Sequence, residues 1–194
     1  MLKEVRSRVE AGWTTTKKLL AALSAWGLIF SVVTISRFGV AFDYDDTLVF
    51  STPAFSKAFR GGSQPFSPAF WAAVNTSYDL ERRKVLPNTL AWLFRVCGFK
   101  ITILAGRPSY EGDALRKEWR HLSKNFAFAD KGSKHALLQS GGHVLYFADS
   151  DSDIMEGRKA RVLTLRVKRS PKSSYKEDYN PGSLRELVLP FTEY

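Results

Sequence analysis

The stretch 43–47, DYDDT, constrains this chain most, because it directly follows an apolar run, residues 38–42, that is typical of a short buried strand. Side chains alternate between the two faces of a strand, so Asp43 and Asp45 are expected to point to one side while Tyr44 points to the other. Two carboxylates that converge in a small volume repel each other unless a cation or a shared proton lies between them. A hard, oxygen-seeking ion such as Mg2+ is the natural occupant. The alternative interpretation is a strand that ends in an acidic, solvated turn.

The alternation of apolar strands with helical patterns predicts the fold. The chain has 194 residues, enough for one α/β domain with a full core. The expected strands are 38–42, 101–104, 144–148 and 161–167, and the expected helices are 88–97, 115–122 and 133–139. This order predicts an α/β fold with a doubly wound parallel sheet. Ligands bind at the carboxyl ends of such strands, so Asp43, Gly106 and Asp149 are expected to converge there.

Two segments rich in glycine, serine and proline, residues 51–68 and 170–182, are predicted to be loops. The lone cysteine, Cys97, falls in the apolar pattern of the 88–97 helix and is predicted to be a small core residue. The three histidines show no metal-ligand spacing, which argues against a zinc site.

The chain is basic, because 29 Lys and Arg residues against 19 Asp and Glu residues give a formal net charge of +10. This balance favours anionic partners, which are phosphorylated small molecules, nucleic acid or an acidic membrane surface. Charge alone does not choose among them. We favour a small phosphorylated substrate over nucleic acid, and we leave a homo-oligomer open.

The N-terminal segment, residues 1–36, is predicted to be an apolar helix. Residues 19–36 carry no charge and follow Lys17 and Lys18, a pattern typical of a signal peptide or a membrane anchor. If the segment is an anchor, its basic N-terminal side places the rest of the chain on the outer face of the membrane. Against this, no clear small-x-small cleavage site follows and a strand begins almost at once, so a buried or interface helix is the alternative interpretation. We favour an exported (periplasmic) or membrane-anchored chain over a cytoplasmic one.

A second acidic turn, residues 149–153 (DSDSD), follows the third expected strand. It would complete a Mg2+ site begun by Asp43 and the backbone carbonyl of Asp45, although alone it is as consistent with a solvated loop or a helix N-cap region. Lys134, at the start of a helix, would balance the negative charge and hold a phosphate, or is a surface lysine. Gly106 would offer a backbone amide to an anion, or is a simple turn glycine.

These residues resemble the four motifs of the haloacid dehalogenase superfamily, and the longer string 42–55, FDYDDTLVFSTPAF, closely resembles the class B bacterial acid phosphatases. The resemblance runs from about residue 38 to residue 194 and includes the terminal 192–194, TEY. It implies that residues 37–194 form one phosphatase domain, a Rossmann-like sheet with a small loop or helical cap.

The resemblance also implies a role for each site residue. Asp43 would be the nucleophile that forms an aspartyl-phosphate, and Asp45 would protonate the leaving alcohol and then activate water. Lys134 would steady Asp43 and the transferring phosphoryl group. Asp149 would bind Mg2+, and Asp153 would support its shell. The implied metal set is Asp43, Asp45, Asp149 and Asp153, and the implied phosphate-binding set is Ala105, Gly106, Arg107 and Lys134.

The family's aromatic pocket for nucleosides and aryl groups would map onto Phe55, Trp71 and Tyr175, although each of them alone is as consistent with core packing. This chain departs from the family at Ala105, where the family has threonine or serine, so one hydroxyl contact to phosphate is missing. The loop between Phe66 and Trp71 is also shorter than in the family, which puts substrate preference and oligomeric contacts in question.

The sequence therefore predicts a Mg2+-dependent phosphomonoester hydrolase that acts through an aspartyl-phosphate, with nucleoside monophosphates or aryl phosphates as candidate substrates. One rival interpretation is a phosphatase that acts on nucleic-acid ends. The other is a phosphate- or nucleotide-binding relative in which Ala105 has weakened catalysis. The joint presence of four residues argues against that loss: Asp43, Asp45, Lys134 and Asp149.

Overall fold

The computed structural model describes residues 2–129, 132–174 and 177–194, with the backbone alone for 2–12 and 14–15. Its helices are α1 (Leu2–Ile35), α2 (Thr52–Arg60), α3 (Pro68–Thr76), α4 (Val85–Val96), α5 (Asp113–Glu118), α6 (Lys134–Ser140) and α7 (Asp151–Lys159). Its strands are β1 (Gly39–Asp43), β2 (Val49–Phe50), β3 (Arg82–Arg83), β4 (Lys100–Ala105), β5 (Asn125–Phe128), β6 (His143–Ala148), β7 (Leu163–Arg166) and β8 (Leu187–Val188). Single 3-10 turns cover residues 78–80 and 119–121.

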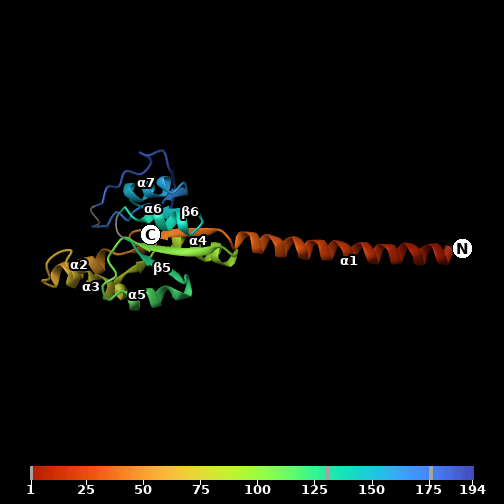
Figure 1. Ribbon diagram of the computed structural model, residues 1–194, viewed down its shortest axis with the longest axis horizontal. Helices are drawn as coiled ribbons and strands as arrows, with labels where there is room; N and C mark the ends of the chain where they lie inside the picture. Colours follow the sequence, from red (N-terminus) through yellow and green to blue (C-terminus); the bar gives the residue numbers. More distant parts are fainter. Residues whose placement is uncertain (1, 130–131, 175–176) are drawn as a thin grey trace.

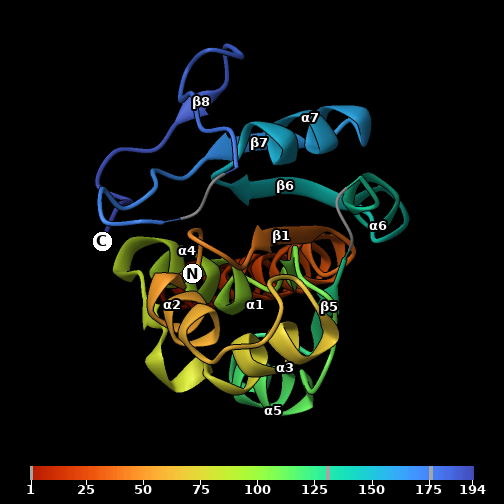
Figure 2. The ribbon, with the colours of Figure 1, turned by 90° about the vertical axis from the view of Figure 1, so that its left-hand side faces the viewer.

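Six parallel strands form the central sheet in the order β5-β4-β1-β6-β7-β8. One face is covered by α4 and α5, which place Ala91 and Leu115 in the larger core cluster. The other face is covered by α6 and α7, and Leu138 of α6 belongs to the second cluster. Figure 2 shows α6 and α7 separated from α4 and α5 by the strands. The predicted α/β fold with a doubly wound parallel sheet is confirmed.

The central strand β1 is buried along its whole length, because helices cover both faces of the sheet. Val40 and Phe42 face the α4 side, where Phe42 stacks on Phe147 with ring centroids 4.6 Å apart. Ala41 faces the α6 side. The alternation of side chains then directs Asp43, the last residue of β1, toward α6 and α7.

The prediction of a loop over residues 51–68 is wrong, since α2 and the start of α3 lie in this segment. The apolar side chains of α2 are spaced for a helix, and its buried residues include Phe55 and Ala58. Ser67 caps α3 by accepting a hydrogen bond from the Phe70 amide at 3.3 Å, and Pro68 suits the first helical turn. The glycine, serine and proline residues therefore mark helix ends, and α2 and α3 form the helical cap over the sheet edge.

One further expectation is confirmed and another is wrong. The segment 170–182 has neither helix nor strand in its described part, residues 170–174 and 177–182, as predicted. Cys97 is exposed, which corrects its assignment to the core. The reason is that Cys97 lies one helical turn after Leu93, which is 56% exposed, whereas α4 turns Pro87 and Ala91 toward the core. The strands β5 and β8 were not expected, because their runs are short.

Helix α1 projects away from the folded domain, as Figure 1 shows. Its segment Thr16–Ile35 has 20 residues and a mean hydropathy of 1.8, and none of this apolar stretch is buried against the domain. It is long and apolar enough to cross a bilayer, and a signal sequence near an N-terminus would meet the same criteria. The division of the chain at residue 36 stays a prediction.

The packing of α7 on β7 leaves no room for a side chain at Gly157. A Cβ atom there would lie 2.0 Å from Thr164 Oγ1 and 3.1 Å from Thr164 Cβ. We expect Gly157→Ala to lower the free energy of unfolding, because overpacking costs about 1–3 kcal/mol. That exceeds the roughly 0.5–1 kcal/mol that alanine gains over glycine inside a helix. Urea unfolding of the purified chain measures the change.

The matched background is Thr164→Ala, which removes the hydroxyl that causes the clash. In this background Gly157→Ala should cost much less than in the native chain. An equal loss in both backgrounds would show that the contact between α7 and β7 does not set the spacing of the two elements.

Candidate active site

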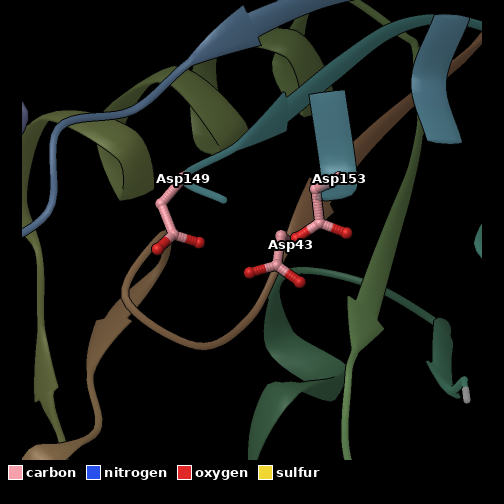
Figure 3. A group of neighbouring side chains, drawn as sticks. All are labelled: Asp43, Asp149 and Asp153. Carbon is pink, nitrogen blue, oxygen red and sulfur yellow. The ribbon is translucent and has the colours of Figure 1, made fainter. Parts of the chain in front are cut away.

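Three buried carboxylates meet at the carboxyl edge of the sheet. Asp43 ends β1, Asp149 follows β6, and Asp153 lies in the first turn of α7. Each offers a ligand oxygen within 4.8 Å of the others. Figure 3 shows the three side chains pointing toward one another from these separate elements. The structure therefore brings together three of the four carboxylates expected to form the metal set.

The ammonium of Lys134 lies inside this carboxylate cluster. Its Nζ donates to Asp43 Oδ1 at 2.6 Å and to Asp153 Oδ1 at 2.7 Å. The side chain is buried, and it reaches the cluster because Lys134 is the first residue of α6. The third carboxylate has a separate partner, since Arg169 Nε donates to Asp149 Oδ2 at 2.6 Å.

Burial sets the protonation of this cluster. It raises the pKa of Asp43 well above its usual value, against the attraction of Lys134. It also raises the pKa of Asp149 to about 7, against the attraction of Arg169. Burial disfavours the charged form of Lys134, but its neighbours Asp153 and Asp43 attract the ammonium more strongly and raise its pKa well above the usual value. The cluster thus holds more negative charge than its buried surroundings favour.

This donor set fits a divalent metal ion. All of its ligand atoms are carboxylate oxygens, which hard cations prefer, and a bound cation would offset both the burial, which is the main cause of the raised aspartate pKa values, and the smaller repulsion among the carboxylates. The fit rests on the chemistry and proximity of Asp43, Asp149 and Asp153.

Asp45 has a different environment from Asp43. Arg107 Nε donates to Asp45 Oδ2 at 3.1 Å, and Arg107 Nη2 donates to Asp45 Oδ1 at 2.5 Å. The same Nη2 donates to Glu81 Oε1 at 2.8 Å, and the Tyr44 hydroxyl donates to Glu81 Oε2. Burial raises the pKa of Glu81, with Arg107 opposing the rise. The guanidinium expected to bind phosphate is therefore engaged by two carboxylates and orients Asp45.

The cluster opens into a cavity of about 160 Å³. Its lining includes Asp43, Asp45, Gly106, Lys134, Asp149 and Asp153, with Ser152, Met155, Glu156 and Lys159 from α7. Gly106 thus lies at the wall of the cavity. Ala105 is fully buried and belongs to the core cluster on the α4 side.

The aromatic residues assigned to a substrate pocket lie in the cap. Phe55 and Trp71 meet edge to face, with ring centroids 6.0 Å apart, and Phe55 is buried. The described part of the cavity wall includes neither of them. The guanidinium of Arg107 lies 5.5 Å from the Phe55 ring centroid, so the cap does contact the residue that holds Asp45. Tyr175 lies outside the described residues.

Sequence reasoning did not single out Glu81 and Arg169. Glu81 is separated by 26 residues from Arg107, and its segment has no apolar pattern that would place it in a site. Arg169 follows the predicted strand 161–167. A residue just after the carboxyl end of a parallel strand is a candidate for the site, so this position could have identified it.

Comparisons with known proteins agree with this fold and site. No family profile matches the chain. The class B acid phosphatase of Klebsiella pneumoniae is 30% identical over an alignment of 172 positions, which covers 80% of this chain and 73% of that protein. The class B acid phosphatase of a Marinomonas species is 27% identical over an alignment of 212 positions, which covers 94% of this chain and 87% of that protein.

Two solved structures share the fold. A protein described as a predicted phosphoglycolate phosphatase from Haemophilus somnus has a TM-score of 0.55 at 13% identity, and covers 80% of this chain and 96% of its own. CbbY from Rhodobacter sphaeroides in complex with phosphate has a TM-score of 0.54 at 12% identity, with 80% and 95% covered.

The parallel sheet with acidic residues at its carboxyl edge is thus the fold of the haloacid dehalogenase superfamily, and within it this chain is a phosphatase. With 30% identity to a relative of which it covers 73%, the chain belongs to the class B acid phosphatase family.

The Arg107 pairs are expected to be essential for the fold of this site. We expect Arg107→Met to lower the free energy of unfolding by about 3–5 kcal/mol, because Asp45 and Glu81 would stay buried without their cation. The matched control is Arg83→Met, which breaks the half-exposed pair with Glu118 and should cost less than about 1 kcal/mol. Urea unfolding measures the free energy of unfolding of both variants. Equal losses would show that the buried Arg107 pairs stabilise the protein no more than the half-exposed pair of Arg83 with Glu118.

Proposed function

We propose that the protein is a Mg2+-dependent phosphomonoester hydrolase that acts through an aspartyl-phosphate. One observation carries this proposal, which is the meeting of Asp43, Asp149 and Asp153 within 4.8 Å at a cavity. An all-carboxylate donor set favours a hard cation, and Mg2+ keeps open coordination positions for phosphate oxygens. When bound, the ion would neutralise charge on the phosphoryl group.

In the proposed first step, an Asp43 carboxylate oxygen attacks the phosphorus atom. The bond from phosphorus to the leaving oxygen breaks, and Asp45 gives its proton to that oxygen so that an alcohol departs. Two contacts support these roles. Asp43 lies at the cavity wall beside Lys134, which would attract the phosphoryl oxygens, and Arg107 fixes the orientation of Asp45 by a two-pronged contact.

In the proposed second step, water attacks the phosphorus atom of the aspartyl-phosphate. Asp45, now deprotonated, accepts a proton from this water while the bond from phosphorus to the Asp43 oxygen breaks. The products are inorganic phosphate and the original carboxylate. Both aspartates line the same cavity, so one site can serve both steps.

The proposed substrate is a small phosphorylated molecule. A cavity of about 160 Å³ accommodates a phosphoryl group and leaves most of the alcohol portion outside. In the cap, the half-buried Trp71, which packs edge to face on the buried Phe55, would offer an apolar face to a nucleoside or an aryl group. The proposed substrates are therefore nucleoside monophosphates and aryl phosphates.

The first test is hydrolysis of p-nitrophenyl phosphate with Mg2+ or with EDTA. We expect metal-dependent turnover in the native chain and none above background in Asp43→Asn, because an amide is a poor nucleophile. Asp113→Asn is the matched control, since its carboxylate is fully exposed and should not affect the rate. Turnover that survives either EDTA or Asp43→Asn would refute the proposed chemistry.

A second variant separates the two steps. Asp45→Asn should lower steady-state turnover by about 10²–10⁴-fold, because the general acid and base is lost. With p-nitrophenyl phosphate, whose leaving group needs little protonation, the first step should continue and phosphorylated protein should accumulate. Intact-mass spectrometry after rapid acid quench detects it. Equal turnover in Asp45→Asn and in the native chain would rule out this role.

The missing hydroxyl at Ala105 gives a further prediction. Ala105→Thr should raise kcat/KM about fivefold over Ala105→Val, because one neutral hydrogen bond is worth about 1 kcal/mol. Threonine and valine have nearly the same shape, so any cost of overpacking this buried position is common to both. Equal kcat/KM values would show that no phosphate contact is missing at this position.

A further inference from the structure

The edge of the sheet opposite the active site has a distinctive surface. We call it the entry edge and define it by the five segments that lead into β1, β4, β5, β6 and β7, which are residues 36–38, 96–100, 123–125, 141–144 and 161–163. The catalytic carboxylates lie at the other ends of these strands. The strands β1 and β4 have 5 and 6 residues, which span about 15–20 Å.

The entry edge is basic. Its five segments, all within the described part of the chain, contain four Lys or Arg residues and no Asp or Glu. The four cations are Arg37, Lys100, Lys124 and Arg161, and each is exposed. They come from four different segments, so positive charge is spread across the edge. Such a surface is complementary to an extended anionic surface.

Apolar side chains are exposed between these cations. Val96 is 77% exposed, Leu163 is 64% exposed and Phe38 is 42% exposed. Apolar groups interspersed with Lys and Arg are typical of surfaces that rest in the headgroup region of a bilayer. A soluble anion would be held by the charges alone and would leave these apolar groups in water.

Helix α1 leaves the domain at this same edge. Its apolar segment ends at Ile35, and β1 begins at Gly39, so three residues connect the two elements. Three residues span at most about 11 Å. The connection is also fixed, because the Ser36 amide donates to Val32 O at 2.9 Å and the Phe38 amide donates to Ile35 O at 3.0 Å. Figure 1 shows the resulting projection of α1 from the domain.

The loop after α4 lies beside this junction. A Cβ atom built on Gly98 would lie 3.8 Å from Ile35 Cγ2. The end of α1 is therefore a neighbour of the segment that carries Val96 and Lys100. If α1 spans a bilayer, the short connection and this proximity bring the entry edge to the lipid headgroups.

We propose that the entry edge binds the surface of a bilayer that contains anionic phospholipid while α1 is inserted in that bilayer. The four cations meet the lipid phosphates, and Phe38, Val96 and Leu163 enter the headgroup layer. The domain then stands with its cavity turned away from the lipid, open to substrates in solution. This inference depends on the exposed residues of the entry edge and on the position of α1. It does not depend on the proposed phosphatase chemistry.

The single cysteine makes this proposal directly testable. Cys97 is exposed and lies within the entry edge. A thiol-reactive, environment-sensitive fluorophore therefore labels the full-length chain at this one position. The labelled chain is reconstituted into vesicles of phosphatidylcholine, or of phosphatidylcholine with phosphatidylglycerol. Both vesicles also contain lipid with a nitroxide quencher near the headgroup. We expect strong quenching in the anionic vesicles and weak quenching in the neutral ones.

The control label is placed at the cap. Cys97→Ser combined with Gln64→Cys moves the fluorophore to the exposed connection between α2 and α3. This label should stay unquenched in both vesicles, because the cap lies at the active-site edge. Equal quenching at both positions would mean that the domain has no fixed orientation, and would overturn the proposal.

Charge reversal tests the part played by the cations. Lys100→Glu with Lys124→Glu should reduce quenching of the Cys97 label in anionic vesicles to the level seen in neutral ones. The matched pair Lys57→Glu with Lys172→Glu makes the same change of net charge at exposed positions near the opposite edge, and should leave quenching as in the native chain. Equal p-nitrophenyl phosphate hydrolysis by both pairs verifies that both are folded.

Three results would overturn the proposal. The first is a full-length chain that does not float with vesicles of either composition. The second is quenching that is the same in neutral and anionic lipid or that survives the reversal of Lys100 and Lys124. The third is a Cys97 label that is shielded from water without lipid quenching, which would show that a second copy of the chain covers this edge.

Discussion

The rest of the site depends on the ammonium of Lys134. From the first turn of α6 it joins Asp43 of β1 to Asp153 of α7, so a single side chain connects three elements on one face of the sheet. The Tyr146 hydroxyl also donates to Asp153 Oδ1, at 3.0 Å. A buried carboxylate that lost such partners would keep its desolvation cost without compensation. The donors are therefore in place before any ligand binds, which is the arrangement that electrostatic catalysis requires.

The two aspartates near the end of β1 acquire different chemistry from different neighbours. Asp43 meets an ammonium and two other carboxylates, a set that can share a cation. Asp45 meets the planar fork of Arg107, which fixes both of its oxygens. Arg107 is itself held by Glu81, so the acid–base candidate is oriented by a network from the cap side of the site. Distinct surroundings of this kind let two identical side chains take distinct roles.

The sequence predicts the parts of the site that follow from strand ends, and it fails where contacts depend on the cap. The apolar run before Asp43 and the one before Asp149 were enough to place both residues at one edge, because parallel strands end together. Arg107 and Glu81 are 26 residues apart in the sequence. Glu81 lies in a short segment without a helical or strand-like alternation of apolar residues, so the sequence does not predict that the two side chains meet. The helices α2 and α3 were missed for a related reason, since their Ser, Pro and Gly residues also suit loops.

The fold also changes the meaning of the net charge of +10. Parallel strands collect carboxylates at one edge of the sheet, where Lys134 and Arg169 pair with them, while exposed lysines and arginines lie at the other edge. Salt largely screens surface charges that lie more than about 8–10 Å away. The electrostatic potential at a phosphate in the cavity is therefore set by these local groups and by any cation that they bind. The overall excess of positive charge is therefore no argument that the active site prefers nucleic acid. Four of the exposed cations, Arg37, Lys100, Lys124 and Arg161, lie at the opposite end of the domain, where α1 leaves it.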